Sequence, residues 1–307
     1  MKTIALAYHN MGIAGLTALA RHGFDITAIF THEDDPGENC WFGSVQDWAL
    51  QHRIPCYTTD NINDEGWVDR IKSWKPDVLF SFYYRKMIGK NILDIPKFGA
   101  LNLHGSLLPA YRGRCPVNWV LVKGEEKTGV TLHFMVEKPD AGDIVGQKEV
   151  FIEFHDTART LYDKLCEAAD VLLDDLLPVI KTGQIPHRKQ NLAEGSYYGG
   201  RRPEDGRIDW TQPAKDIYNL IRAVTDPYPG AFALLENGSR IIIWRALPVE
   251  AHDMNGQVGD MESAGQDVLV KTGKNAIKLL DVEVQGTKLK GSEIGEFFKM
   301  RKVMKLT

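Results

Sequence analysis

The first hundred residues alternate between short apolar runs and longer amphipathic stretches. The runs are typical of buried strands, and the stretches between them repeat their apolar positions with the period of a helix. This pattern predicts strands over residues 2–8, 25–31, 54–57, 77–83 and 99–104, with helices over residues 12–22, 44–53 and 64–74. Such alternation indicates an α/β fold with a Rossmann-like, mostly parallel sheet, helices on both faces, and ligands bound at the carboxyl ends of the strands.

The pattern changes in the second half of the chain. Weaker alternation predicts strands over residues 128–136 and 144–154, and a long apolar stripe predicts a helix over residues 157–181. After one more helix, over residues 213–224, only short β-like runs remain, at residues 231–235, 240–244, 257–259, 267–271 and 276–284. We therefore predict two domains: residues 1–203, and a smaller, mostly β, barrel-like (OB-like) domain over residues 204–307.

Polar residues interrupt the apolar strand predicted over residues 99–104. Asn102 and His104 are two positions apart, so on a strand their side chains leave the same face. The amide can donate a hydrogen bond to a developing oxyanion, and the imidazole can move a proton near neutral pH if a carboxylate such as Asp140 holds it. These groups suit acyl transfer without a protein nucleophile, although an isolated Asn-x-His pair is more often structural.

The sequence around this pair narrows the interpretation. The loop GSLLPAYRGR (residues 105–114) combines glycine and proline, which fix its path, with two arginines that suit anionic groups. With Asp140, this run resembles the 10-formyltetrahydrofolate-dependent formyltransferase family. The resemblance extends over the whole chain, through residues 7–12, 30–32, 80–85, 200–203 and 226–231. It is strongest to the branch that formylates UDP-4-amino-4-deoxy-L-arabinose.

The resemblance implies transfer of a formyl group from 10-formyltetrahydrofolate to the amine of a nucleotide-linked amino sugar. The family's catalytic roles fall on Asn102 for the oxyanion, His104 for the proton and Asp140 for support of the imidazole. The folate cosubstrate is expected at Lys86, Met87, Ile88, Arg114, Val136, Glu137, Lys138, Pro139 and Asp140. For the arabinose branch, the implied pathway is lipid A modification and resistance to polymyxin.

The sugar nucleotide is expected to contact His9, Met11, Gly12, Asn118, Arg201 and Tyr228. The loop over residues 9–12 opens a predicted helix, where free backbone N–H groups attract phosphate. It lacks the GxGxxG pattern, so a dinucleotide is not indicated. Arg201 suits a diphosphate and Tyr228 can stack on a base, but a structural role for each of these residues stays open.

Composition excludes several other classes of protein. The chain carries a net charge of −4 and has no apolar stretch as long as a membrane span, so we expect neither nucleic-acid binding nor membrane insertion. Its four cysteines show no CxxC or paired spacing, and its histidines show no metal-ligand spacing. We therefore expect a cytoplasmic protein that uses no metal, and an oligomer is possible.

Several alternatives share the catalytic motif. A methionyl-tRNA formyltransferase would need a basic surface, for which Lys271, Lys274, Lys278, Lys288 and Lys290 are the candidates. Another UDP- or dTDP-amino sugar, a non-catalytic folate or nucleotide binder, and hydrolysis of formyltetrahydrofolate also remain open. Many relatives of the arabinose branch continue into a dehydrogenase-like domain, so the chain is either free-standing or part of a bifunctional enzyme.

Overall fold

A computed structural model describes residues 1–37, 39–251, 254–301 and 305–307, which form two compact units. The first unit consists of Met1–Pro116, Lys127–Ile152 and Tyr162–Gly199, and the second of Val117–Glu126, Glu153–Leu161 and Gly200–Thr307. The domain boundary that we predicted after residue 203 lies close to the passage from Gly199 to Gly200. The pattern of apolar and polar residues did not indicate that Val117–Glu126 and Glu153–Leu161 join the second unit.

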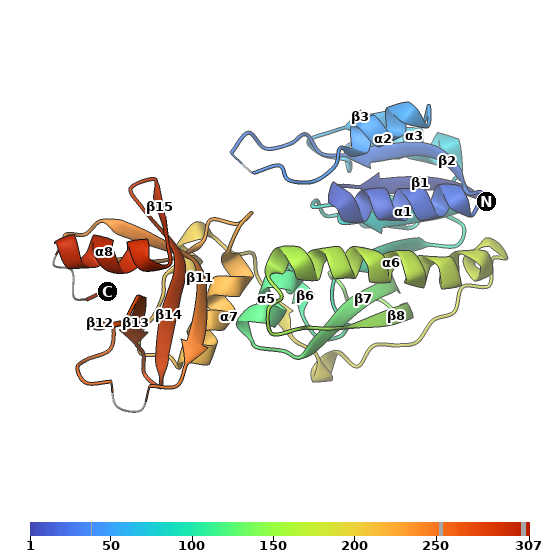
Figure 1. The fold of residues 1–307 in the computed structure, drawn as a ribbon. Coiled ribbons are helices and arrows are strands. Elements are labelled where there is room, and N and C mark those ends of the chain that lie inside the picture. The colour runs from blue at the N-terminus through green and yellow to red at the C-terminus, as the bar shows by residue number, and fades with distance from the viewer. Residues whose placement is uncertain (38, 252–253, 302–304) are drawn as a thin grey trace. The chain divides into compact units, whose positions relative to one another are not determined.

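The first unit is built on a seven-stranded sheet with the order β3-β2-β1-β4-β5-β7-β8 (Figure 1). The strands are β1 Lys2–Ala7, β2 Asp25–Thr31, β3 Cys56–Thr58, β4 Val78–Phe82, β5 Ala100–His104, β7 Lys127–Phe134 and β8 Ile144–Phe151. The five strands β1 to β5 are parallel to one another, whereas β7 pairs antiparallel with β5, and β8 pairs antiparallel with β7. This confirms the predicted α/β class with a mostly parallel sheet.

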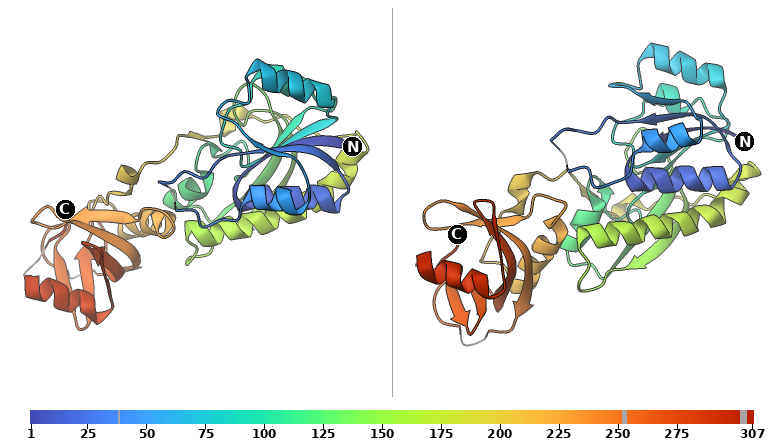
Figure 2. Two further views of the ribbon diagram at one scale, coloured as in Figure 1. Left: turned by 90° about the horizontal axis from the view of Figure 1, so that it is seen from above. Right: turned by 45° about the horizontal axis from the view of Figure 1, so that its top comes forward.

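Helices lie on both faces of this sheet, as Figure 2 shows. They are α1 His9–Arg21, α2 Val45–Gln51, α3 Glu65–Trp74, α4 Lys90–Leu93 and α6 Ala158–Lys181, which begins in the second unit. On one face, Ile4 and Leu79 join a buried cluster with Ile71 of α3 and Ile92 of α4. Alternation along β5 places Asn102 and His104 on the same side as Ala100, a further member of this cluster.

Helix α1 begins at His9, earlier than the predicted start at Gly12. Its first turn is completed by a distant residue, because the Met11 N–H donates to Tyr162 Oη at 2.9 Å. A partner so far along the chain cannot be read from local sequence, which explains the error in the predicted start.

The second unit contains an antiparallel sheet with the order β10-β11-β14-β13-β12, and β15 pairs with β14. Its elements are α5 Pro116–Val122, α7 Ala214–Val224, β10 Ala231–Leu234, β11 Arg240–Val249, β12 Met261–Ala264, β13 Asp267–Lys271, β14 Ala276–Val284, β15 Thr287–Lys290 and α8 Ser292–Arg301. The predicted mostly β domain is therefore confirmed.

Some details of the second unit differ from the predictions. The strand predicted over residues 257–259 is wrong: this stretch leads into β12, and Gly259 has a φ of 85° that a regular strand does not allow. Helix α8 was not predicted. A closed barrel would pair the two edge strands, β10 and β12. Among the described residues, the sheet order does not pair them, and isolated bridges join Leu235 to Leu306 and Asp260 to Lys305. No helix among the described residues has both the length and the apolar character of a membrane span.

Candidate active site

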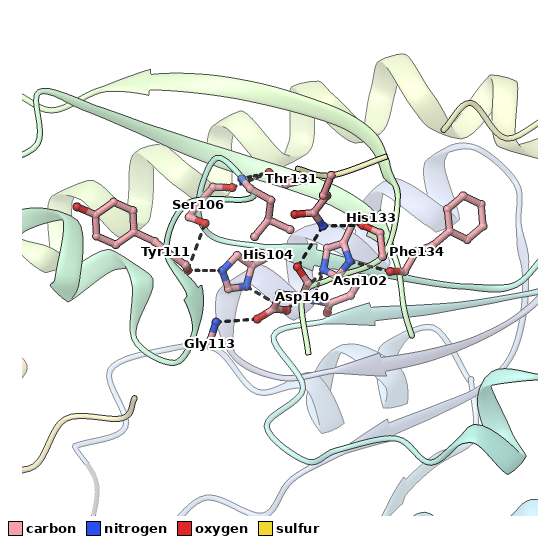
Figure 3. Close-up of polar contacts among 12 residues, drawn as sticks. Asn102, His104, Ser106, Tyr111, Gly113, Thr131, His133, Phe134 and Asp140 are labelled. Atoms are coloured by element: carbon pink, nitrogen blue, oxygen red, sulfur yellow. Dashed lines mark hydrogen bonds and ion pairs between the residues drawn. The ribbon is translucent and has the colours of Figure 1, made fainter. Parts of the chain in front are cut away.

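The pairing of β5 with β7 brings a second histidine to the predicted catalytic residues. In this antiparallel register, Asn102 lies opposite His133. Asn102 Nδ2 is 3.1 Å from His133 Nε2, and Asp140 Oδ1 is 3.6 Å from both His133 Nε2 and His104 Nδ1. Figure 3 shows the four side chains together. Asn102, His104 and Asp140 are thus neighbours, and His133 contacts the amide and the carboxylate.

Asp140 is held as a carboxylate in this site. It follows β7, has a φ of 51°, and accepts a hydrogen bond from the Gly113 N–H at 2.8 Å through Oδ2. Burial alone would raise the pKa of the Asp140 carboxyl, but positive charge on His104 and His133 when these rings are protonated, together with the Gly113 N–H, lowers it well below its ordinary value. Asp140 is therefore a permanent negative charge beside both imidazoles near neutral pH.

A backbone carbonyl determines which ring nitrogen of His104 carries the hydrogen. Its Nε2 lies 2.9 Å from Tyr111 O. Since a carbonyl oxygen only accepts, Nε2 carries a hydrogen, and the neutral ring presents Nδ1 as its basic atom. Asp140 Oδ1 is 3.6 Å from that atom, which is long for a hydrogen bond but close enough to stabilise a proton gained there. Proton uptake by His104 is therefore assigned to Nδ1.

His133 orients the amide of Asn102 by the same logic. Its Nδ1 lies 2.8 Å from Phe134 O and so carries a hydrogen, which leaves Nε2 of the neutral ring to accept from Asn102 Nδ2. One amide hydrogen is thereby committed to His133, and the other remains for a developing oxyanion. His133 was not singled out from the sequence, because the register that places it opposite Asn102 is not visible there.

The loop after β5 is held by a segment far along the chain, residues 190–198, which we call the strap. Strand β6 (Arg112–Gly113) pairs in parallel with β9 (Tyr197–Tyr198) in the strap. The Tyr111 N–H donates to Ser196 Oγ at 2.8 Å, and the Arg112 N–H donates to Ser196 O at 3.0 Å. These bonds fix the Tyr111 carbonyl that meets His104 and the Gly113 N–H that meets Asp140.

The residues expected to bind folate lie on loops that follow β4 and β7, the two neighbours of β5, except Arg114, which directly follows β6. Met87 and Val136 expose 58% and 45% of their surface, which is unusual for apolar side chains, whereas Ile88 is buried. Lys86 directs Nζ to Thr59 O and Asp60 O, at 2.7 Å each. Of the others, Glu137, Lys138 and Arg114 are exposed and Pro139 is half-buried. Exposed apolar groups on both loops provide contact surface for a flat ring.

The residues expected to bind phosphate near α1 are placed differently from the prediction. His9 is buried, with its ring centroid 3.8 Å from that of Phe42. The N–H groups of Met11 and Gly12 already donate to Tyr162 Oη and to Tyr8 O, respectively. The expectation that Met11 and Gly12 offer free N–H groups to a phosphate is therefore not supported, because both groups have acceptors inside the protein.

The remaining substrate candidates belong to the second unit. Asn118 Nδ2 donates to Ala223 O at 2.7 Å. The Arg201 guanidinium lies 4.7 Å from the ring centroid of Trp119 and donates to Asp205 O. The Tyr228 N–H donates to Thr225 O. Asn118 and Arg201 thus have clear structural contacts within their own unit.

A cavity of about 260 Å³ opens at the carboxyl ends of β1 and β2, and its lining includes none of the catalytic residues. It is lined by Tyr8, Thr31, His32, Glu33, Asp34, Gly43, Ser44, Val45 and Gln46. Tyr8 Oη donates to Asp34 Oδ1 at 2.9 Å, and His32 Nε2 accepts from the Arg85 N–H at 3.0 Å. Burial, and then the charges of Lys86 and Arg85, lower the pKa of His32 to about 4. The cavity is therefore polar, with a neutral imidazole.

Comparison with solved structures shows the same fold in formyl-transferring proteins. WlaRD, a sugar 3N-formyl transferase solved in the presence of dTDP and 5-N-formyl-THF, is 21% identical with a TM-score of 0.69, over 94% of this chain and 98% of that one. An N-formyltransferase from Helicobacter canadensis, solved with folinic acid and dTDP-3-aminofucose, is 20% identical with a TM-score of 0.68, over 91% and 97% of the two chains.

A longer protein contains the same arrangement. HypX from Aquifex aeolicus, solved with tetrahydrofolic acid, is 20% identical with a TM-score of 0.60; the match covers 97% of this chain but only 48% of HypX. Two family models also match the sequence: Formyl transferase over residues 14–176, and Formyl transferase, C-terminal domain, over residues 201–299. Together these two regions cover most of the chain, which belongs to the formyl transferase family.

Proposed function

We propose that the protein transfers a formyl group from 10-formyltetrahydrofolate to the amine of a nucleotide-linked amino sugar. The observation that carries this proposal is the convergence of Asn102, His104 and Asp140 in a member of the formyl transferase family. WlaRD and the Helicobacter canadensis enzyme, solved with dTDP or a dTDP-sugar and a formyl-folate compound, support the substrate class. As acceptor we place UDP-4-amino-4-deoxy-L-arabinose first, on the sequence resemblance, and a dTDP-amino sugar second.

The geometry gives each residue a separate part in the reaction. The neutral amine attacks the formyl carbon, a new C–N bond forms, and the formyl oxygen gains negative charge. The Asn102 amide hydrogen that is not bound to His133 donates to this oxygen. His104 Nδ1 takes the proton that the attacking amine loses, beside the Asp140 carboxylate, and returns it to the folate nitrogen as the old C–N bond breaks.

We place the folate against Met87 and Val136, whose exposed side chains offer apolar contact to its rings. Backbone groups of residues 86–88 and 136–140 would contact the pterin edge, and the exposed Arg114 suits the glutamate carboxylates. For the sugar nucleotide we retain His9, Met11 and Gly12 as residues that shape the β1–α1 loop. Asn118, Arg201 and Tyr228 remain candidates for the diphosphate and the base.

The acceptor is tested by supplying formyl donor with UDP-4-amino-4-deoxy-L-arabinose, a set of dTDP-amino sugars, methionyl-tRNA, or no amine, and identifying the formylated product. We expect turnover with a nucleotide amino sugar and little with tRNA or water. Preference for the UDP-arabinose derivative would support a role in lipid A modification and polymyxin resistance. Preference for tRNA, or folate binding without transfer to any amine, would reject the proposed function.

Catalytic roles are tested by Asn102→Ala and His104→Ala. Removing one oxyanion donor typically lowers kcat by about a hundredfold or more, and we expect losses of at least that size for both variants. Binding of folate and of the sugar nucleotide, measured by calorimetry, should stay close to wild type. Asn237→Ala, which alters an exposed turn in the second unit, is the control and should leave kcat unchanged. Wild-type rates in either active-site variant would contradict these roles.

A further inference from the structure

Gln190, at the start of the strap, binds the back of the loop that carries Asp140. Its Nε2 donates to Asp140 O at 3.1 Å and also to Gly142 O. Because both acceptors are carbonyl oxygens, the orientation of the amide is fixed by its contacts. The Gln190 Oε1 atom is buried and has no hydrogen-bond partner among the described residues. Burying an unpaired acceptor is unfavourable, and the two hydrogen bonds that Nε2 donates offset part of this cost.

The two carbonyls that Gln190 binds belong to a tightly packed turn. Asp140 has a left-handed backbone conformation with a φ of 51°, which is unfavourable for most residues without support. Gly142 packs so closely that an added Cβ would lie 1.9 Å from Phe134 O. The Phe134 N–H closes the turn by donating to Asp143 O at 2.8 Å. The backbone of this turn determines where the Asp140 carboxylate points.

The same strap also holds the partner side of the acid–base pair. Ser196 binds the backbone N–H groups of Tyr111 and Arg112, and Tyr111 O accepts from His104 Nε2. Gln190 therefore acts on the carboxylate of the pair, and Ser196 acts on the imidazole. Within the part of the chain that the structure describes, neither Gln190 nor Ser196 donates a hydrogen bond to His104, so each acts on the pair through backbone groups.

We propose that Gln190 is a positioning residue for formyl transfer. Its amide locks the turn over residues 140–142 in the conformation that aims the Asp140 carboxylate at His104 Nδ1 and His133 Nε2. The proposal rests on the proposed function, because Asp140 matters for rate only if His104 moves a proton.

The first test is Gln190→Met, which keeps the length of the side chain and removes both donors. A misplacement of about 1 Å in a reacting group can cost about a hundredfold in rate, and we expect kcat to fall by roughly tenfold to a hundredfold. KM for the amino sugar should change less than about twofold, because the hydrogen bonds of the Gln190 side chain among the described residues go only to the Asp140 turn. The matched control is Gln184→Met, at an exposed position before the strap, which should retain wild-type kcat.

The deciding measurement is a double-mutant cycle with Asp140→Asn. If Gln190 acts through Asp140, the double variant should be no more than about twofold slower than Asp140→Asn alone. Losses that multiply, or wild-type kcat in a folded Gln190→Met protein, would overturn the proposal. Gln190→Glu, which is similar in size but repels both carbonyls, is the second variant; failure of both variants to fold would assign Gln190 a purely structural role. Absence of transfer by the wild-type enzyme would instead reject the proposed function.

Discussion

Two backbone carbonyls determine how the histidines of the site are used. Tyr111 O accepts a hydrogen bond from His104 Nε2, and Phe134 O accepts one from His133 Nδ1. The remaining nitrogen of each ring then faces a functional group, Asp140 for His104 and Asn102 for His133. One imidazole is thus set to accept a proton and the other to orient an amide, although both are the same residue type.

The lowered pKa of Asp140 also affects the free energy of unfolding. A carboxyl whose pKa is lowered on folding contributes stability that is present above its unfolded pKa, about 3.9, and that is lost as the pH falls towards the folded pKa. We expect Asp140→Asn to reduce the free energy of unfolding by about 2 kcal/mol at pH 7, by at least as much at pH 5, where the neighbouring imidazoles carry more positive charge, and by less below about pH 4. Denaturant unfolding at these pH values measures the difference.

The control for this prediction is Asp175→Asn, which changes an exposed carboxyl on α6. This variant should unfold like wild type at every pH. A difference between wild type and Asp140→Asn that grows as the pH falls below about 4 would show that the Asp140 carboxyl is not stabilised in its charged form.

The site was predictable from sequence only as far as local spacing reaches. Asn102 and His104 share a face because they are two apart on a strand, and Asp140 was assigned from the resemblance. His133 and Gln190 gave no such signal. The first acquires its role from the register between β5 and β7, and the second from a turn some fifty residues earlier in the chain, so both depend on tertiary contacts.

Among the secondary-structure elements, the shortest ones hold the catalytic groups. Strands β6 and β9 each have two residues, yet their pairing positions both Tyr111 O and the Gly113 N–H. Gly113 has a φ of 97°, and a Cβ at this position would lie 2.1 Å from Tyr198 O. A side chain is excluded there by backbone conformation and by the close approach of the strap.

We therefore expect Gly113→Ala to separate β6 from β9 and to withdraw the N–H that Asp140 Oδ2 accepts. The loss in kcat should be at least tenfold, with a lower melting temperature, because both the strained backbone and the clash oppose the native loop. Kinetics and thermal unfolding test this expectation. Gly199→Ala, where no atom lies within 4 Å of the added Cβ, is the matched control. Normal activity in Gly113→Ala would show that this pairing does not position the site.

An element was predictable where its sequence shows a clear pattern of apolar and polar residues. Strand β2 was predicted at its observed bounds, Asp25–Thr31, because the polar residues Asp25 and Thr31 enclose a mostly apolar run over residues 26–30. Helix α4 has only four residues, too few for an apolar stripe. Helix α8 has apolar residues at 294, 297 and 298, a helical spacing that extends over little more than one turn. The strap contains no long element, and its structure is determined by the loop that it contacts.

For the whole molecule, the main difference from the two consecutive domains predicted is that segments of the two units alternate along the chain. Segments 117–126 and 153–161 interrupt the first unit but belong to the second. Their contacts explain why: Asn118 Nδ2 donates to Ala223 O, and Tyr218 Oη donates to Phe154 O. Arg222 also donates to Asp156 O, at 3.3 Å. Sequence periodicity identifies elements but not the unit that each element joins.

This interleaving predicts that the fragment over residues 1–203 does not behave as an independent domain. Without residues 204–307, the buried residues Val117 and Leu121 lose the unit to which they belong, and the contacts made by Asn118 and Phe154 lose their partners. We expect the fragment to melt at a lower temperature than the full chain and to bind a hydrophobic dye, because apolar surface becomes exposed.

The matched control is the full chain cleaved at an inserted protease site after residue 203. It has the same break in the backbone but retains residues 204–307, so it should keep a melting temperature close to that of the intact protein. Separately produced residues 204–307, added to the fragment, should reduce dye binding by covering the segments over residues 117–126 and 153–161. A fragment that melts like the full chain and binds no dye would show that these segments are stable without the rest of the second unit, and that the linear boundary is also a boundary of folding.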